Sequence, residues 1–159
     1  MEISARHHLR NDEVQHLRAE LDEHFGAEIR GETFEAVSFT STDEEIVLVD
    51  GAPTILRLET GPVLTVQGAN SFEPDKRIVV VDAGAVSFVS NGADIMRPGI
   101  VEADPEIEAG DAVLIAEETH GKVLAVGHAR TDGADMIGEE GKVVDTVHYV
   151  GDEWFDFSP

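Results

Sequence analysis

The apolar residues of this chain come in short runs of strand length, separated by turns rich in glycine and proline. Residues 78–81 form one such run, and residues 143–149 contain another. Short runs rich in β-branched residues favour β-strands, and glycine-rich turns at this spacing favour a compact barrel over a parallel sheet. No run approaches the roughly 18 apolar residues that cross a bilayer. The pattern predicts a β-rich globular protein, and because no basic, apolar leader opens the sequence we expect no membrane contact and a cytoplasmic location.

A helix is predicted near the start of the chain, at residues 12–25. Apolar residues recur there at helical spacing, after Asn11 as the N-cap and before Gly26 as the stop. Strands follow at residues 34–39, 46–49, 54–58 and 63–66, and a linker-like stretch at 68–75 leads into a second group of strands. We therefore expect an α+β fold, with an N-terminal α/β domain at residues 1–74 and a β-barrel domain at residues 75–159.

The charge of the chain is strongly negative. Its 33 acidic residues outnumber the 11 basic ones, the net charge is −22, and the acids are spread along the whole sequence. Such a surface is typical of extreme halophiles, because about 1 M salt shortens the Debye length to about 3 Å and makes self-repulsion tolerable. The alternative is an acidic mesophilic protein that binds basic partners, although the acidic residues of such proteins usually occur in blocks. We therefore expect a halophilic protein.

Several classes of site have no signature in this sequence. There is no cysteine, so thiolate nucleophiles and cysteine–zinc sites are excluded, and the seven histidines never form H-x-x-x-H or H-E-x-x-H. Neither a G-x-S-x-G nucleophile motif, nor a Walker-type loop, nor a strand-linked G-x-G-x-x-G occurs. We therefore expect no catalytic residues, no metal and no cofactor.

The most informative segment is residues 81–100, where glycines divide a strand, a short helix and a second strand. Gly84 stands at the strand-to-helix junction, Gly92 ends the helix, and Pro98-Gly99 closes the second strand. A glycine at such a junction lets another backbone approach closely, and the start of a helix presents N–H groups suited to phosphate. The spacing is therefore compatible with a nucleic-acid surface.

The same segment is almost free of acid. Residues 83–101 hold a single acidic residue, Asp94, although the chain average of one acid per about five residues predicts nearly four. Carboxylates that face phosphate groups would be repelled, so their absence is expected of a surface that binds RNA. Simple burial of the segment is the alternative explanation.

These residues resemble the PUA domain, an RNA-binding module named after pseudouridine synthases and archaeosine transglycosylases. The likeness continues in four later segments. They are residues 107–113, with a Gly-Asp turn before a strand, and residues 124–127, 141–144 and 148–154. The resemblance implies a PUA β-barrel, or pseudobarrel, at residues 75–159 that binds structured RNA.

One subfamily is similar over the whole chain, namely the archaeal PUA proteins related to the malignant-T-cell-amplified-sequence translation factors. The likeness rests on residues 92–99 and on the ending from His148-Tyr149 to Trp154. Those proteins begin with a pre-PUA domain whose first helix follows a basic, histidine-containing start, as residues 6–10 do here. The resemblance implies binding of the tRNA acceptor end or of ribosomal RNA, on the small ribosomal subunit with a translation-factor partner.

Two alternatives stay open. The chain could be the RNA-positioning accessory of a tRNA-modifying enzyme of the archaeosine transglycosylase type, since those enzymes also place a small domain before their PUA module. It could also be a protein-interaction module whose barrel has lost RNA, which only the net charge of −22 suggests.

If the RNA contacts of the family apply to the matching positions here, the resemblance implies an RNA-binding surface at residues 84–99 and on the last strand. The implied contacts are Gly84, Ala85, Phe88, Gly92, Ala93, Met96, Arg97, Pro98, Gly99 and His148. Arg97 is the sharpest candidate, because a guanidinium can fork two phosphate oxygens or stack on an unpaired base. For Phe88 and Met96, a place in the core is the stronger expectation. The remaining basic residues of this half are expected to be solubilising surface residues: Lys76, Arg77, Lys122, Arg130 and Lys142.

Overall fold

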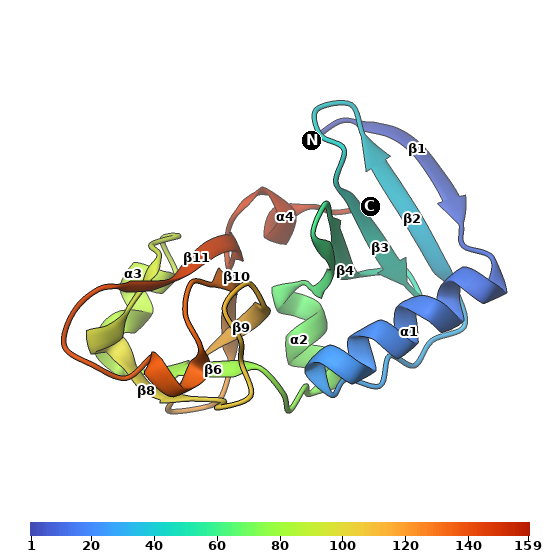
Figure 1. Ribbon diagram of the computed structural model, residues 1–159. Coiled ribbons are helices and arrows are strands. Elements are labelled where there is room, and N and C mark those ends of the chain that lie inside the picture. Colours follow the sequence, from blue (N-terminus) through green and yellow to red (C-terminus); the bar gives the residue numbers. More distant parts are fainter. The chain divides into compact units, whose positions relative to one another are not determined.

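The computed structural model describes residues 1–159, and the chain divides into two compact units (Figure 1). The first unit comprises Met1–Pro74 together with Asp156–Pro159, and the second comprises Asp75–Phe155. The last four residues thus belong to the first unit, where Phe157 packs edge-on against Phe39 with ring centroids 5.2 Å apart. None of the helices combines the length and the apolarity that crossing a bilayer requires.

The first unit is built on a five-stranded antiparallel sheet in the order β1-β2-β3-β4-β5. The strands are β1 (Ile3–His8), β2 (Phe34–Phe39), β3 (Glu45–Val49), β4 (Ala52–Leu58) and β5 (Gly61–Leu64). Two helices complete the unit, α1 (Asn11–Phe25) and α2 (Val66–Phe72). The interior strands β2 and β3 are the most buried, whereas every residue of the edge strand β1 is exposed.

Helix α1 confirms the predicted helix, with its cap one residue earlier than expected. The backbone N–H of Arg10 donates to the Glu13 carboxylate at 3.1 Å, so Arg10 rather than Asn11 is the N-cap. Gly26 adopts the left-handed conformation, with φ of 67°, and ends the helix as predicted. One face of α1 is buried through Leu17 and Leu21, among others.

Helix α2 corrects the expectation of a linker at residues 68–75. The Thr65 hydroxyl caps this helix by accepting a hydrogen bond from the backbone N–H of Gly68 at 2.9 Å. Gly68 lies directly against the backbone of Thr54, where a Cβ atom would collide with the carbonyl oxygen. Small residues that look like linker composition are therefore required here by close packing.

The second unit is a six-stranded mixed sheet that wraps around its own core in a barrel-like form, in the order β7-β11-β10-β9-β6-β8. The strands are β6 (Ile78–Val81), β7 (Ile95–Met96), β8 (Ile100–Ala103), β9 (Ala112–Glu117), β10 (Val123–Ala129) and β11 (Lys142–Tyr149). Strand β6 runs parallel to β9, and all other pairs are antiparallel. Two short helices lie in this part of the chain, α3 (Val86–Val89) and α4 (Glu153–Asp156), and the last residue of α4 is assigned to the first unit. The predicted α+β fold with a C-terminal barrel is confirmed.

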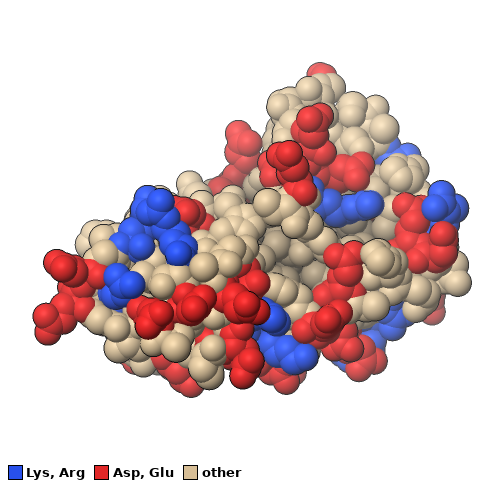
Figure 2. All heavy atoms as spheres, in the orientation of Figure 1, with Lys and Arg blue, Asp and Glu red and all other residues tan.

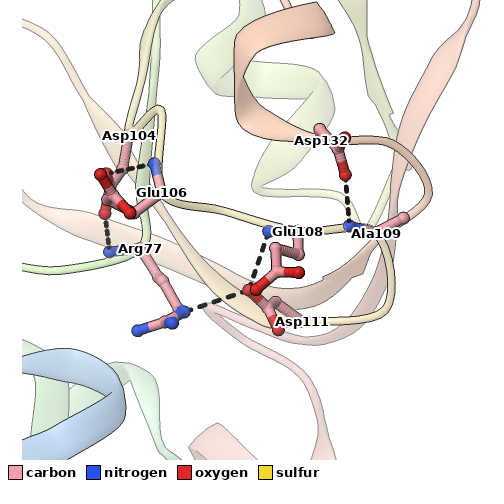
Figure 3. A network of polar contacts seen from close by, with 7 residues as sticks. All are labelled: Arg77, Asp104, Glu106, Glu108, Ala109, Asp111 and Asp132. Carbon is pink, nitrogen blue, oxygen red and sulfur yellow. Dashed lines mark hydrogen bonds and ion pairs between the residues drawn. The ribbon is translucent and has the colours of Figure 1, made fainter.

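Carboxylates fix the loop between β8 and β9 by accepting hydrogen bonds from its backbone (Figure 3). Asp104 accepts from the N–H of Arg77 at 2.6 Å and from that of Glu106 at 3.0 Å. Asp111 accepts from the N–H of Glu108 at 2.9 Å and from Arg77 Nε at 3.1 Å. Arg77, expected to be a solubilising surface residue, is thus tied into the fold, and part of the acidic surface serves to hold loops.

Candidate RNA interface

The segment from β6 to the turn after β7 folds around an open groove of about 450 Å³. The groove is lined by Val81, Asp82, Gly84, Ala85, Phe88, Val89, Ala93, Asp94, Ile95, Met96, Pro98 and Gly99. Seven of the ten predicted contact residues are among them: Gly84, Ala85, Phe88, Ala93, Met96, Pro98 and Gly99. The structure therefore brings most of the predicted residues to one concave surface, whereas Gly92, Arg97 and His148 do not line it.

Two large apolar side chains of this groove are exposed to solvent. Phe88 is 67% exposed and Met96 is 48% exposed. The expectation that both lie in the core is wrong, because helix α3 has a single turn and turns only Val89 inward. An exposed aromatic ring and a thioether that line the same groove are suited to hold a flat, apolar-faced group such as a nucleobase.

The two acids of the groove are occupied by hydrogen bonds from the protein itself. Asp82 accepts from the backbone N–H of Ala85 at 3.0 Å. Asp94 accepts from the backbone N–H of Thr146 at 2.8 Å and lies 3.2 Å from Lys142 Nζ. The Thr146 hydrogen bond is the main cause that lowers the pKa of Asp94, and it outweighs the desolvation that raises it; Lys142 lowers it further. Both carboxylates are thus structural parts of the groove wall.

A cluster of basic residues is formed by Arg97, Arg130 and Lys142: Lys142 and Arg130 lie beside Asp94, and the backbone of Arg97 is hydrogen-bonded to that of Gly141, the neighbour of Lys142 in the chain. Lys142 Nζ lies 3.5 Å from the Asp145 carboxylate, and Arg130 Nε lies 3.3 Å from the same group. Strand pairing sets Lys142 opposite Met96 at the groove. Figure 2 shows basic atoms gathered on one face of the second unit, on a surface that is otherwise largely acidic or uncharged. Arg130 and Lys142 were expected to be isolated solubilising residues, and only the strand pairing reveals them as a group.

Arg97 is anchored to the loop that precedes β11. Its Nε donates to the carbonyl oxygen of Asp135 at 2.9 Å, and its Nη1 donates to that of Glu140 at 3.0 Å. Its backbone N–H donates to the carbonyl oxygen of Gly141 at 2.9 Å. Nε and Nη1 of the guanidinium are thus already engaged by the protein. Arg97 contributes positive charge at this face, but this pair of donors is not available for a bidentate contact with phosphate.

His148 is fully buried, which corrects the expectation that it contacts RNA. Its ring Nδ1 lies 2.9 Å from Asp152, and the Asp152 carboxylate also accepts from the backbone N–H groups of Tyr149 and Phe155, each at 2.9 Å. Burial alone would raise the pKa of Asp152, but the hydrogen bond from His148, the one from the Phe155 N–H and the other favourable contacts together lower it. The pair secures the end of β11.

Gly92 is required by geometry at the other end of α3. Its φ is 86°, a conformation that favours glycine, and a Cβ atom there would lie 2.7 Å from the Tyr149 ring. Neither residue lines the groove: Gly92 packs against the Tyr149 ring, and His148 is buried against Asp152.

Comparison with known proteins gives matches to the second unit and to the whole chain. The model of the PUA domain matches residues 77–150. An uncharacterized protein of Methanocaldococcus jannaschii is 37% identical over 99% of both chains. A crystal structure of a hypothetical protein from Pyrococcus horikoshii superposes with a TM-score of 0.86 and 32% identity, covering 96% of this chain and 98% of that one.

A relative with a functional name matches part of the chain. Translation machinery-associated protein 20 of Saccharomyces cerevisiae is 33% identical over 87 residues, which are 50% of this chain and 48% of that protein. The match to the PUA model and the whole-length archaeal matches establish the family. The chain belongs to the PUA-domain proteins, as a member similar to archaeal proteins of its own length and to yeast translation machinery-associated protein 20.

Proposed function

We propose that this protein binds structured RNA of the translation apparatus, without catalysis, through the groove between α3 and β7. The observation that carries the proposal is the groove itself, which exposes Phe88 and Met96 beside a basic cluster on a chain of net charge −22. The family match supports an RNA ligand, and the name of the yeast relative supports a place in translation.

The ligand in this proposal is the acceptor end of a tRNA or an exposed segment of ribosomal RNA. Either has unpaired bases that can leave their own stack and lie against side chains. A base would occupy the groove between Phe88 and Met96, while the adjoining phosphates would pass over the basic cluster. Arg97 would then act on the phosphates mainly as a positive charge, because its Nε and Nη1 hold the loop.

The high salt that this protein is expected to need determines which contacts can hold a polyanion such as RNA. In about 1 M salt the entropy gained by releasing counterions is small, so diffuse positive charge contributes little. Directional contacts and stacking do not depend on counterion release to the same extent, so high salt weakens them much less. Stacking contributes about 1 to 3 kcal/mol per base. The few basic residues of this chain are therefore compatible with RNA binding.

A non-catalytic role is supported by the chemistry of the groove. Asp82 and Asp94 are its ionisable residues, and each already accepts hydrogen bonds from backbone N–H groups. A general base needs a lone pair directed toward the substrate. One oxygen of Asp82 is engaged by the Ala85 N–H, and Asp94 is engaged by the Thr146 N–H and by Lys142.

Replacing Phe88 by alanine tests the proposed function. Phe88→Ala is expected to weaken binding of a fluorescently labelled tRNA acceptor-stem hairpin with an unpaired 3′ strand, titrated in about 1 M salt, by about 1 to 3 kcal/mol because one stacking surface is lost. Val101→Ala is the matched control, since Val101 is 46% exposed in the same unit but does not line the groove. Equal affinities for Phe88→Ala and the parent would remove the groove from RNA binding.

Co-purification separates the proposal from the accessory role. An affinity-tagged copy of the chain, captured from its own cell extract in molar salt, is expected to carry small ribosomal subunits. Capture of a transglycosylase catalytic chain instead would favour a part in tRNA modification.

A further inference from the structure

The first unit has a polar hollow between α1 and the segment that leads into β2. The hollow has a volume of about 450 Å³ and lies where the end of β1 and one face of α1 meet residues 31–34. Asn11, Gln15 and Arg18 lie along that face, on successive turns of the helix. The other polar residues of the lining are His8, Glu32 and Thr33. This open space is therefore lined mainly by polar side chains.

Arg18 is the one arginine of the chain that has no partner in the protein. Six of the other arginines lie 2.8 to 3.9 Å from a carboxylate, and Arg97 donates to two backbone carbonyls. Asp22, one turn further along the helix, does not pair with Arg18, because helix side chains lean toward the N-terminus and carry Arg18 toward Gln15. In a chain with three acids for every basic residue, a half-buried arginine without a carboxylate is an exception.

The neighbours of Arg18 in the hollow are also unpaired. The side chains of His8, Asn11 and Gln15 form no hydrogen bond within the protein. Most of the unpaired groups are N–H donors, namely the guanidinium, the two side-chain amide groups and one ring N–H. A ligand with several acceptor oxygens can satisfy these donors together.

The carboxylates nearby leave these donors free. Asp12 and Glu13, in the first turn of α1, do not line the hollow, and Arg10 engages them: its Nε lies 3.1 Å from Asp12, and its backbone N–H lies 3.1 Å from Glu13. Glu32 is the one acid of the lining, and it forms no ion pair with Arg18. Its carboxylate can accept a hydrogen bond from a hydroxyl group of a ligand.

We propose that this hollow binds a phosphate monoester of a sugar, of the kind that a nucleoside monophosphate carries. A monoester has a charge of about −1.5 to −2 at neutral pH and three strong acceptor oxygens, which match the unpaired donors better than the two oxygens of a carboxylate. Arg18, Gln15 and Asn11 hold the phosphate, and Glu32 accepts from a sugar hydroxyl. The site lies in the first unit and does not depend on RNA binding by the groove.

The probe for this proposal is adenosine monophosphate, added to the full-length ¹⁵N-labelled protein at constant ionic strength, in the lowest potassium chloride concentration in which the protein stays folded. Binding is expected to shift, in a saturable way, the side-chain amide signals of Asn11 and Gln15 and the Nε–H signal of Arg18. Adenosine, which lacks the phosphate, and adenylyl-adenosine, which has only a diester, are each expected to bind about tenfold or more weakly.

Variants on one helix and one loop complete the test. Arg18→Gln is expected to weaken binding of adenosine monophosphate about tenfold or more, because the charged donor is lost. Gln15→Ala is expected to weaken it severalfold. Arg30→Gln is the matched control, since Arg30 is exposed in the same unit, lies 3.9 Å from Glu28 and is outside the hollow. Unchanged signals at millimolar nucleotide, equal affinities for the monoester, adenosine and the diester, or parental affinity in Arg18→Gln would overturn the proposal.

Discussion

Transfer from about 1 M to about 0.1 M salt is expected to lower the melting temperature by roughly 10 to 20 °C. The acids cover both units in Figure 2, and the net charge is −22. Two like charges about 10 Å apart repel by ~0.4 kcal/mol in unscreened water and by roughly 0.15 kcal/mol in 0.1 M salt, where the Debye length is about 10 Å. About thirty such pairs amount to about 5 kcal/mol, which is comparable with the whole stability of an ordinary domain.

Circular-dichroism melts in a potassium chloride series measure this effect. A parallel series in sucrose is the control, because sucrose strengthens burial without screening charge. Potassium chloride is expected to raise the melting temperature steeply up to about 1 M, where the Debye length has fallen to about 3 Å, and only gradually beyond that. Equal midpoints in low and molar salt would remove the argument that this surface reflects a saline habitat.

Asp152→Ala is expected to destabilise the second unit by about 3 kcal/mol, because hydrogen bonds to a charged acceptor are among the strongest and their loss leaves a buried donor unsatisfied. Three donors converge on this carboxylate, one of them the ring of the fully buried His148. Urea unfolding in molar salt, followed by the fluorescence of Trp154, the one tryptophan of the chain, measures the loss.

The control for Asp152→Ala is Glu139→Ala, which removes the same charge from an exposed loop of the same unit. This control is needed because removing any acid relieves repulsion in so negative a chain. Folding lowers the pKa of Asp152, so its contribution is present above the pKa of an unfolded aspartate and is lost as the pH falls through the lower, folded value. The difference between the parent and Asp152→Ala is therefore expected to shrink below about pH 4. A constant difference down to pH 2 would contradict the assigned role.

Local patterns in the sequence predicted much of the fold. Helix α1 follows from apolar spacing between an acidic first turn and Gly26, and most strands of both units follow from β-branched runs between turns. Strand β1 was missed because its polar, histidine-containing residues carry no apolar alternation, and it is a strand only because β2 offers a pairing edge. Helix α2 was missed because its glycine looked like linker composition. Gly68 is required by close packing against the backbone of Thr54, which lies 14 residues earlier in the chain.

The candidate site was predictable in position but not in the roles of its residues. Residues 83–101 contain a single acid, which can be seen in the sequence, and most of the groove is lined by residues of this segment. Whether Phe88 faces solvent depends on a helix of one turn, which no periodicity can resolve. The cluster of Arg97, Arg130 and Lys142 comes from three separate stretches that meet only through the pairing of β7, β11 and β10. The burial of His148 depends on Asp152, whose separation of four residues across a turn is the one signal that could have indicated the pair.

The most direct test of RNA binding at the groove is amide mapping of the ¹⁵N-labelled protein during titration with a tRNA acceptor-stem hairpin that ends in an unpaired 3′ strand, in about 1 M salt. A blunt-ended hairpin of the same stem is the control for the unpaired bases. We predict shifts concentrated at residues 84–99 and 142–146, largest around Phe88 and Met96, with β1 to β5 unchanged. Shifts confined to the first unit, or none in the groove at saturating RNA, would contradict the account.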